Sequence, residues 1–259
     1  MRDINAYAKE YTSGKTSAFE IKLSEYRTKR SISIIQKYDH KNLIEVGCAL
    51  WPIACYVDDI KKYVLVEPAD EYMQNAREKL KSKNAIFVKG FFEDKFDQLA
   101  DIFSNDGVDF VLLSGLLHEV ENPKDLLRTA MNLMNSKTVT LITVPNAKSF
   151  HRLLALKSGL IKSIYDFGDT NIRLQQHFVF DMDSFSQMLF DVSSELNKKV
   201  NILEKGSFFV KPFTHKQMQQ CLDFEIFDET VLNGLDEMTE YVPELGSEIY
   251  IIFRVEDLN

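Results

Sequence analysis

The feature of this sequence that most limits its fold is a regular alternation of apolar runs and helix-compatible segments between residues 43 and 144. The apolar runs are rich in β-branched or aromatic residues and occupy 43–46, 63–66, 85–88, 108–114 and 138–144. The segments between them have the apolar spacing of amphipathic helices and lie near 52–59, 70–83, 94–104 and 123–135. This alternation predicts parallel strands joined by right-handed crossovers, with helices on both faces of the sheet.

The first two apolar runs enclose a candidate ligand site. The first run ends in a glycine turn at Gly47, and the second ends in an acid, Glu67, twenty residues later. In a doubly wound sheet, such a turn lets a nucleotide-like ligand approach the backbone, and the acid accepts hydrogen bonds from a ribose diol. The spacing therefore predicts a ligand that carries a ribose.

The glycine turn lacks features of a dinucleotide site. Ala49 and Trp51 stand where a second and third glycine would allow a pyrophosphate to approach the backbone. This difference weighs against a nicotinamide-dependent oxidoreductase, which remains an alternative on the same fold. Glu45, the acid that precedes the turn, is unfavourable for an anion but suits a ligand with a positive group, such as an ammonium.

Helical character is also expected before the first strand. Residues 17–38 have helical spacing that no proline or glycine interrupts, which predicts one long helix. We expect residues 1–40 to form an N-terminal helical lid, in which residues 1–14 are either ordered over the ligand or a frayed tail.

The pattern changes after Pro145. Residues 147–199 hold two or three helical stretches and are too long for a simple crossover, so they are expected to form a helical substrate cap. Strand character returns at 200–210 and 248–255. The prediction is a doubly wound α/β fold with a mostly parallel seven-stranded sheet, whose core comprises residues 41–146 and 200–259.

Composition and charge exclude several classes of function. The chain has 259 residues, of which 45% are hydrophobic, enough for one full core. A formal net charge of -8 gives no long-range attraction to nucleic acid or an anionic membrane, so neither is an expected partner. No uncharged apolar run approaches the roughly 18 residues of a membrane span, and no signal peptide is expected. Three cysteines without CxxC spacing favour a cytoplasmic protein without a zinc site.

Several motifs, in their order along the chain, resemble those of class I S-adenosylmethionine-dependent methyltransferases. They are residues 45–49, the acid Glu67 in VLVEP, KGFFED at 89–94 and VDFVLLSGLLHEVENP at 108–123. This resemblance covers residues 40–150 and implies a Rossmann-like fold with S-adenosyl-L-methionine as the cofactor. The later segments VPNAKSFHRLL, RLQQHFVFD and GSFFVKPFTHKQM resemble the substrate side of a bacterial branch that includes small-molecule and sugar O-methyltransferases.

The resemblance also implies a set of cofactor-binding residues at the ends of the first four strands. Glu67 would hold both ribose hydroxyls, and Glu93 would lie beside the adenine and its exocyclic amine. The residues around the two glycines would face the methionine half. The expected set is Glu45, Gly47, Cys48, Glu67, Pro68, Phe92, Glu93, Ser114 and Gly115.

His118 is the candidate catalytic residue, because it lies just beyond the fourth strand, at the sheet edge where ligands of α/β folds bind. An imidazole with an ordinary pKa of about 6.5 suits the removal of a hydroxyl proton. Glu119 could act instead, and His118 could equally serve to order its loop.

Polar side chains of the later segments are candidates for substrate binding. Arg152 and Lys211 could neutralise a phosphate or a carboxylate on the substrate. Arg27 and Arg30 of the first helix have two alternatives, contact with the cofactor carboxylate or a solvated face, and the solvated face is expected. The histidines lack the close spacing of metal ligands, so no metal is expected. The expected substrate-binding set is His151, Arg152, His177 and Lys211.

These observations predict a methyltransferase that acts on a hydroxyl of a small polar metabolite or sugar derivative. Transfer would be in line, with His118 as the general base. The alternatives are N-methylation of a small molecule and a non-catalytic module that binds S-adenosylmethionine. The acceptor, the choice between oxygen and nitrogen, and the oligomeric state stay open.

Overall fold

The structure is a computed structural model, which describes residues 4, 8, 17–168, 171–172 and 174–258. Apart from residues 4 and 8, the segment 1–14 that was considered as a tail or part of a lid lies outside the described residues. The division of the chain into lid, core and cap therefore stays a prediction.

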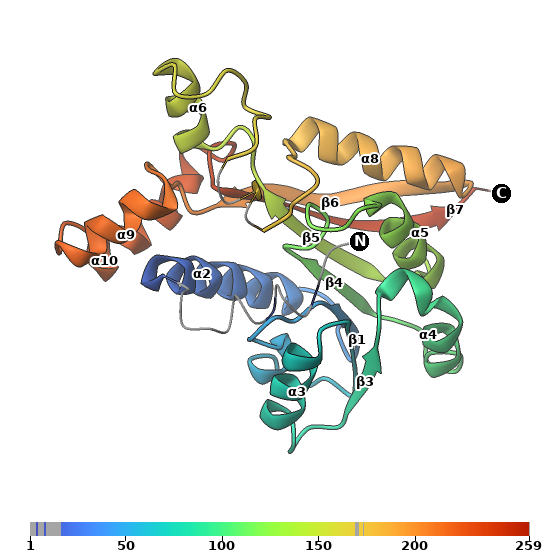
Figure 1. Ribbon diagram of the computed structural model, residues 1–259. Helices are drawn as coiled ribbons and strands as arrows, with labels where there is room; N and C mark the ends of the chain where they lie inside the picture. Colours follow the sequence, from blue (N-terminus) through green and yellow to red (C-terminus); the bar gives the residue numbers. More distant parts are fainter. Residues whose placement is uncertain (1–3, 5–7, 9–16, 169–170, 173, 259) are drawn as a thin grey trace.

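A single seven-stranded sheet forms the centre of the fold, in the order β3-β2-β1-β4-β5-β7-β6 (Figure 1). Strands β1 to β5 pair in parallel, and β7 runs antiparallel between β5 and β6. The strands are β1 (Asn42–Val46), β2 (Lys62–Glu67), β3 (Ala85–Lys89), β4 (Phe110–Ser114), β5 (Val139–Pro145), β6 (Lys198–Phe208) and β7 (Glu248–Asp257). The predicted α/β fold with a mostly parallel seven-stranded sheet is confirmed.

Helices cover both faces of this sheet. They are α2 (Ala18–Ile35), α3 (Asp70–Lys79), α4 (Phe96–Ile102), α5 (Pro123–Leu133), α6 (Phe150–Lys157), α8 (Met182–Glu195), α9 (His215–Asp223) and α10 (Glu229–Glu237). Short 3₁₀ turns occupy Ile53–Cys55, Phe92–Asp94 and Met238–Glu240. Capping residues set where three of these helices begin. Ser17 accepts a hydrogen bond from the Glu20 amide at the start of α2, and Asp181 and Thr214 form capping boxes at the starts of α8 and α9.

Alternation along β1 divides the core into two layers. Leu43 belongs to the apolar cluster that packs under α2, α3, α9 and α10, whereas Ile44 belongs to the cluster under α4, α5 and α8. Successive side chains of a strand point to opposite faces. The same alternation places Glu45 on the face of Leu43, with consequences for the site below.

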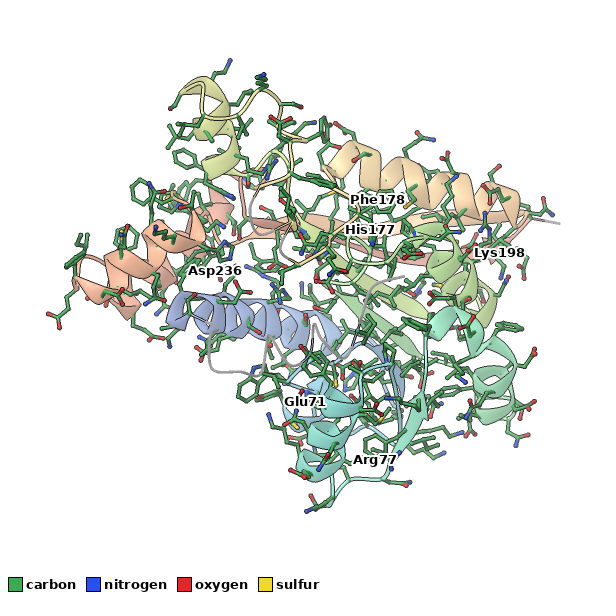
Figure 2. All side chains as sticks on the ribbon, in the orientation of Figure 1. Glu71, Arg77, His177, Phe178, Lys198 and Asp236 are labelled. Carbon is green, nitrogen blue, oxygen red and sulfur yellow. The ribbon has the colours of Figure 1, made fainter. Side chains whose placement is uncertain are left out.

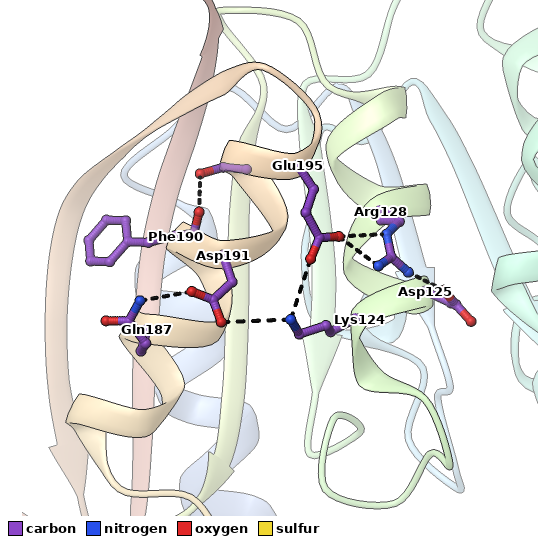
Figure 3. A network of polar contacts seen from close by, with 8 residues as sticks. Lys124, Asp125, Arg128, Gln187, Phe190, Asp191 and Glu195 are labelled. Atoms are coloured by element: carbon purple, nitrogen blue, oxygen red, sulfur yellow. Dashed lines mark hydrogen bonds and ion pairs between the residues drawn. The ribbon is translucent and has the colours of Figure 1, made fainter.

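The expected cap segment 147–199 divides into two parts. Helix α6 and the connection after it lie beyond the end of the sheet near α9, whereas α8 runs along β6 beside α5 (Figure 1). Ion pairs join α5 to α8: Glu195 accepts from Arg128 at 2.6 Å and lies 3.4 Å from Lys124, which also lies 3.6 Å from Asp191 (Figure 3). Helix α8 therefore belongs to the layer that covers the sheet.

No helix in the described part of the chain combines the length and apolar character that crossing a membrane requires.

Candidate functional site

A cavity of about 950 Å³ opens at the carboxyl ends of β1, β2, β4 and β5. The turns after these strands form one side, and α2, α6 and the segment leading into α9 form the other. The strand order reverses between β1 and β4, which is where α/β sheets bind ligands. Helix α2 lies across this end of the sheet (Figure 1).

The cavity brings together most of the site residues that the sequence suggests. From the cofactor set it is lined by Gly47, Glu67, Pro68, Glu93, Ser114 and Gly115. From the catalytic and substrate sets it is lined by His118, His151, Arg152 and Lys211. Four residues of the sets lie outside the lining, namely Glu45, Cys48, Phe92 and His177.

Two glycines at neighbouring strand ends have left-handed backbones. Gly47 has a φ of 71° and follows β1, and Gly115 has a φ of 64° and follows β4. An added Cβ at Gly47 would meet Leu116 at an ordinary 3.7 Å. The backbone conformation rather than space therefore favours glycine at this position. Both turns present bare backbone to the cavity.

Glu67 is buried at the end of β2, where its side chain is 3% exposed. Its Oε1 accepts a hydrogen bond of 2.8 Å from the Ala69 amide. Burial raises the pKa of this carboxyl to about 7, although the Ala69 and Cys48 amides act in the opposite direction. A carboxylate has about four acceptor positions, so Glu67 can still accept from both hydroxyls of a diol.

Glu45 is directed away from the cavity because it shares the β1 face of Leu43. Its Oε2 accepts from the Ile53 amide at 2.9 Å and from the Tyr63 hydroxyl. Burial raises the pKa of Glu45 to about 7. These contacts tie β1 to β2 and to the 3₁₀ turn Ile53–Cys55.

Cys48 and Phe92 are also buried outside the cavity. Cys48 packs in the cluster under α2 and α3, and Phe92 packs in the cluster under α4 and α5. The neighbouring Phe91 lines the cavity together with Glu93. The sequence motif locates this turn, but the 3₁₀ turn that begins at Phe92 decides which ring is exposed to a ligand.

His118 lies in the turn after β4, lines the cavity and is 5% exposed. Its Nε2 is 3.8 Å from Oε1 of Glu119. The backbone carbonyl of His118 accepts a 2.9 Å hydrogen bond from the His177 amide. His177 thus supports the site through its backbone, while its exposed side chain lies in the connection before α8 (Figure 2).

Arg27 of α2 is a site residue that the sequence offered only as an alternative, in contact with the cofactor carboxylate. It lines the cavity and donates from Nε to both carboxylate oxygens of Glu248, at 2.8 and 3.0 Å. Its guanidinium lies 3.9 Å from the Cβ position of Gly115. The expectation of a solvated face is therefore wrong for Arg27, because α2 lies across the strand ends. Arg30 lies 3.8 Å from Asp236.

The helical positions of α2 contained a signal for this face. Glu20, Leu23 and Arg27 follow i, i+3, i+7 spacing and all line the cavity. Nothing in the sequence indicates their partners, which come from segments about 200 residues away.

A basic cluster forms the wall opposite the strand turns. Lys211 is 3% exposed, and its Nζ lies 2.9 Å from Nδ1 of His215. His215 Nε2 lies 2.8 Å from Oε2 of Glu20. Nearby, His151 Nδ1 lies 3.1 Å from the Ser149 hydroxyl. Burial and the charges of Lys211 and Arg152 lower the pKa of His151 to about 2.

Among the residues that the structure describes, no group of three or more His, Cys, Asp or Glu side chains is arranged to hold a metal ion.

A family model described as a methyltransferase domain matches residues 23–192. This match includes most of α2, the strands β1 to β5 and most of α8, whereas cavity residues such as Glu20, Lys211 and Glu248 lie outside it. A search of curated proteins finds no sequence match.

Solved structures share the fold at low sequence identity. An S-adenosylmethionine-dependent methyltransferase from Thermotoga maritima, described as a possible histamine N-methyltransferase, has a TM-score of 0.56 and 12% identity over 96% of each chain. The N-methyltransferase NodS from Bradyrhizobium japonicum, in complex with S-adenosyl-L-homocysteine, has a TM-score of 0.53 and 10% identity, covering 94% of this chain and 90% of its own. A methyltransferase from Archaeoglobus fulgidus has a TM-score of 0.54 and 15% identity, covering 97% and 99%.

Proposed function

Because the chain belongs to the methyltransferase domain family, we propose that it transfers a methyl group from S-adenosylmethionine to a hydroxyl of a small polar metabolite or sugar derivative. The observation that carries the proposal is the cavity of about 950 Å³, which joins the Glu67 carboxylate, two left-handed glycines and His118. One space of this kind can hold a nucleoside-bearing donor beside a small acceptor.

The cofactor of this family is S-adenosyl-L-methionine, and the residues of the cavity fit its parts. Glu67 suits the ribose diol, and the Gly47 and Gly115 turns allow the methionine portion to approach the backbone. Arg27, beside Gly115, suits the cofactor carboxylate. When bound, the cofactor supplies a sulfonium-linked methyl group that an acceptor oxygen can displace in line.

His118 takes the proton of the acceptor hydroxyl in this proposal. It stands in the turn after β4, with the Glu119 carboxylate 3.8 Å from its Nε2. A carboxylate at this distance stabilises the imidazolium that results from proton transfer. The backbone bond from His177 holds the His118 turn in place.

A nitrogen acceptor is the main alternative, and two of the structural relatives described above are named for N-methylation. It differs in its need for a base, because an amine that enters unprotonated attacks without prior loss of a proton. A non-catalytic binding module is the other alternative. It would bind the cofactor without transferring a methyl group.

The test is transfer of labelled methyl from S-adenosylmethionine to metabolites of a cell extract. We expect a methylated product with wild-type protein and a loss of rate of about 100-fold with His118→Ala. His177→Ala is the matched control and should keep the wild-type rate, because its side chain is exposed outside the cavity.

Each other outcome points to a different account. An unchanged rate with His118→Ala excludes His118 as the base. A product methylated at nitrogen supports the N-methyltransferase alternative. Cofactor binding without any product supports the binding module, whereas binding of NADH in place of S-adenosylmethionine would support the oxidoreductase.

A further inference from the structure

We propose that the methyl acceptor carries a carboxylate, which Arg152 and Lys211 bind at the wall of the cavity formed by α2, α6 and the segment leading into α9. This inference rests on the proposed methyl-transfer function and specifies the substrate class. It is carried by the hydrogen-bond donors that remain on that wall, and by the absence of a carboxylate paired with Arg152 or Lys211 among the described residues.

Arg152 is oriented by backbone carbonyls. Its Nε and Nη2 donate to the Ile164 carbonyl at 3.0 and 2.7 Å, and Nη2 also donates to the Asp166 carbonyl. These bonds use the single Nε hydrogen and both Nη2 hydrogens. The two Nη1 hydrogens have no acceptor among the described residues. Because Arg152 lines the cavity, these two hydrogens remain available to a ligand there.

Asp166 belongs to the loop that orients Arg152, and its carboxylate is hydrogen-bonded within that loop. The Asp166 carboxylate accepts from the amides of Lys162 and Ser163, at 2.8 and 3.0 Å. Within the described part of the chain, no carboxylate oxygen accepts a hydrogen bond from Arg152. The guanidinium charge is thus held in position without a bonded counterion.

Lys211 is held by a short relay of side chains. An ammonium can only donate, so His215 Nδ1 must be the acceptor in their 2.9 Å contact. His215 is then protonated at Nε2 and donates to Glu20 at 2.8 Å. Burial and the Lys211 charge lower the pKa of His215, in agreement with a neutral ring. Two ammonium hydrogens of Lys211 remain without an acceptor in the part of the chain that the structure describes.

Among the described residues, neither Arg152 nor Lys211 forms an ion pair with a carboxylate. Glu248 pairs with Arg27, and Glu20 lies against His215. Asp166 acts on Arg152 only through its longer-range charge. His151 is neutral because its pKa is lowered to about 2, and Lys216 is exposed to solvent. A buried ammonium beside a half-buried guanidinium is costly to desolvate unless an anion pairs with them.

An anion that enters here can pair with both side chains, and the acids that also line the cavity favour a carboxylate over a phosphate dianion. A second negative charge would also meet the acids at the other side of the cavity, Glu93, Asp94, Glu119 and Glu121. The Nη1 hydrogens and the Lys211 ammonium can each donate to a carboxylate oxygen, and such charge-assisted bonds are among the stronger ones in proteins. The carboxylate thus orients the acceptor, and its methyl-accepting group is a separate part of the molecule.

The first experiment measures binding without requiring turnover. Protein saturated with S-adenosylhomocysteine is titrated with para-fluorobenzoate and with the uncharged para-fluorobenzamide, and binding is followed by fluorine NMR. Wild-type protein should bind the carboxylate about tenfold more tightly than the amide. Arg152→Gln and Lys211→Met should each remove this preference.

The matched controls lie in the ion-pair network between α5 and α8 (Figure 3) and do not line the cavity. Arg128→Gln and Lys124→Met remove the same charges there and should keep the carboxylate preference. The affinity for S-adenosylhomocysteine verifies that each variant is folded. If Lys211→Met does not fold, the half-buried Arg152→Gln decides the result.

Three results would overturn the inference: no detectable carboxylate binding at millimolar concentration, equal affinity for both probes, or a preference that survives Arg152→Gln. The labelled-methyl experiment separates its failure from that of the proposed function. If a methylated product forms but an anion exchanger does not retain it at neutral pH, the inference of a carboxylate on the acceptor is contradicted and the proposed methyl transfer is not. Carboxylate preference without any methylated product contradicts the proposed function instead.

Discussion

The ammonium nitrogen of Lys211 lies 2.9 Å from Nδ1 of His215, and this contact fixes the proton of the ring on the side of Glu20. Lys211 and His215 belong to one short segment that leads from β6 into α9, and this segment meets Glu20 of α2, about 200 residues away in the sequence. The contact holds a buried cation at the cavity wall without using all of its donors, so a ligand can complete its coordination.

The pH dependence of carboxylate binding should follow Lys211. Burial lowers the pKa of Lys211 to about 8, so the ammonium is present at pH 7 and lost at higher pH. The affinity for para-fluorobenzoate should fall by about tenfold between pH 7 and pH 9.5, because one charge-assisted bond is lost. The benzamide affinity is the internal control and should stay constant. A benzoate affinity that stays level over this range, or that falls equally in Lys211→Met, would show that Lys211 is not the responsible group.

Cofactor affinity should also depend on pH, in the opposite direction. The pKa of Glu67 is raised to about 7 by burial, so its carboxylate becomes protonated as the pH falls below 7. A protonated carboxyl accepts hydrogen bonds from a diol less well. The affinity for S-adenosylhomocysteine should therefore weaken from pH 8 to pH 5.5 in the wild type. Glu67→Gln should bind weakly at both pH values, and a wild-type curve without slope would contradict the assignment.

The raised pKa of the buried Glu45 should be visible in the pH dependence of the unfolding free energy. Its folded pKa of about 7 exceeds the value near 4.5 of a free carboxyl, so the folded state holds this proton more tightly. The resulting stability is fully present below pH 4.5 and is lost as the pH rises through 7. Between pH 5 and pH 8 the wild type should lose about 3 kcal/mol of unfolding free energy relative to Glu45→Gln. Urea titrations of both proteins across this pH range measure the difference. If the unfolding free energies of the two proteins change equally with pH, the raised pKa of Glu45 is contradicted.

The left-handed turn after β4 should tolerate alanine only at a cost. Gly115 has a φ of 64°, and an added Cβ would lie 3.9 Å from the Arg27 guanidinium, an ordinary contact distance. Gly115→Ala should fold and lose about 1 kcal/mol of unfolding free energy, because a left-handed alanine is strained. Gly234→Ala in α10 is the control, since its Cβ would meet nothing within 4 Å and its backbone is helical. A loss at Gly115 no greater than at Gly234 would contradict the strain argument.

The sheet could be predicted from the sequence because its strands are short β-branched runs that turn residues delimit. All seven expected strands are present, including β6 and β7 after the long insertion. The position of α8 could not be predicted in the same way. Its helical pattern shows an apolar face but not which surface covers it, and tertiary contacts place it against β6 and α5.

The candidate site was likewise predictable only in part. The motif order located the turns that hold Gly47, Glu67 and His118, because these depend on strand ends that the sequence marks. Whether a neighbour such as Glu45 or Phe92 faces the cavity depends on strand alternation and on one 3₁₀ turn. The contacts of Arg27 with Glu248 and of Glu20 with His215 join residues about 200 positions apart. A single sequence carries no signal for such pairs.

The central claim is that the turns after β1, β2 and β4 bind S-adenosylmethionine, with Glu67 holding its ribose. Calorimetric titration of S-adenosylhomocysteine at pH 8 into wild type, Glu67→Ala and the surface control Glu195→Ala tests this claim most directly. The account predicts binding to wild type and to Glu195→Ala with equal affinity, and an affinity about 100-fold lower for Glu67→Ala, because two charge-assisted hydrogen bonds are lost. Unchanged affinity in Glu67→Ala, or no binding to the wild type, would contradict it.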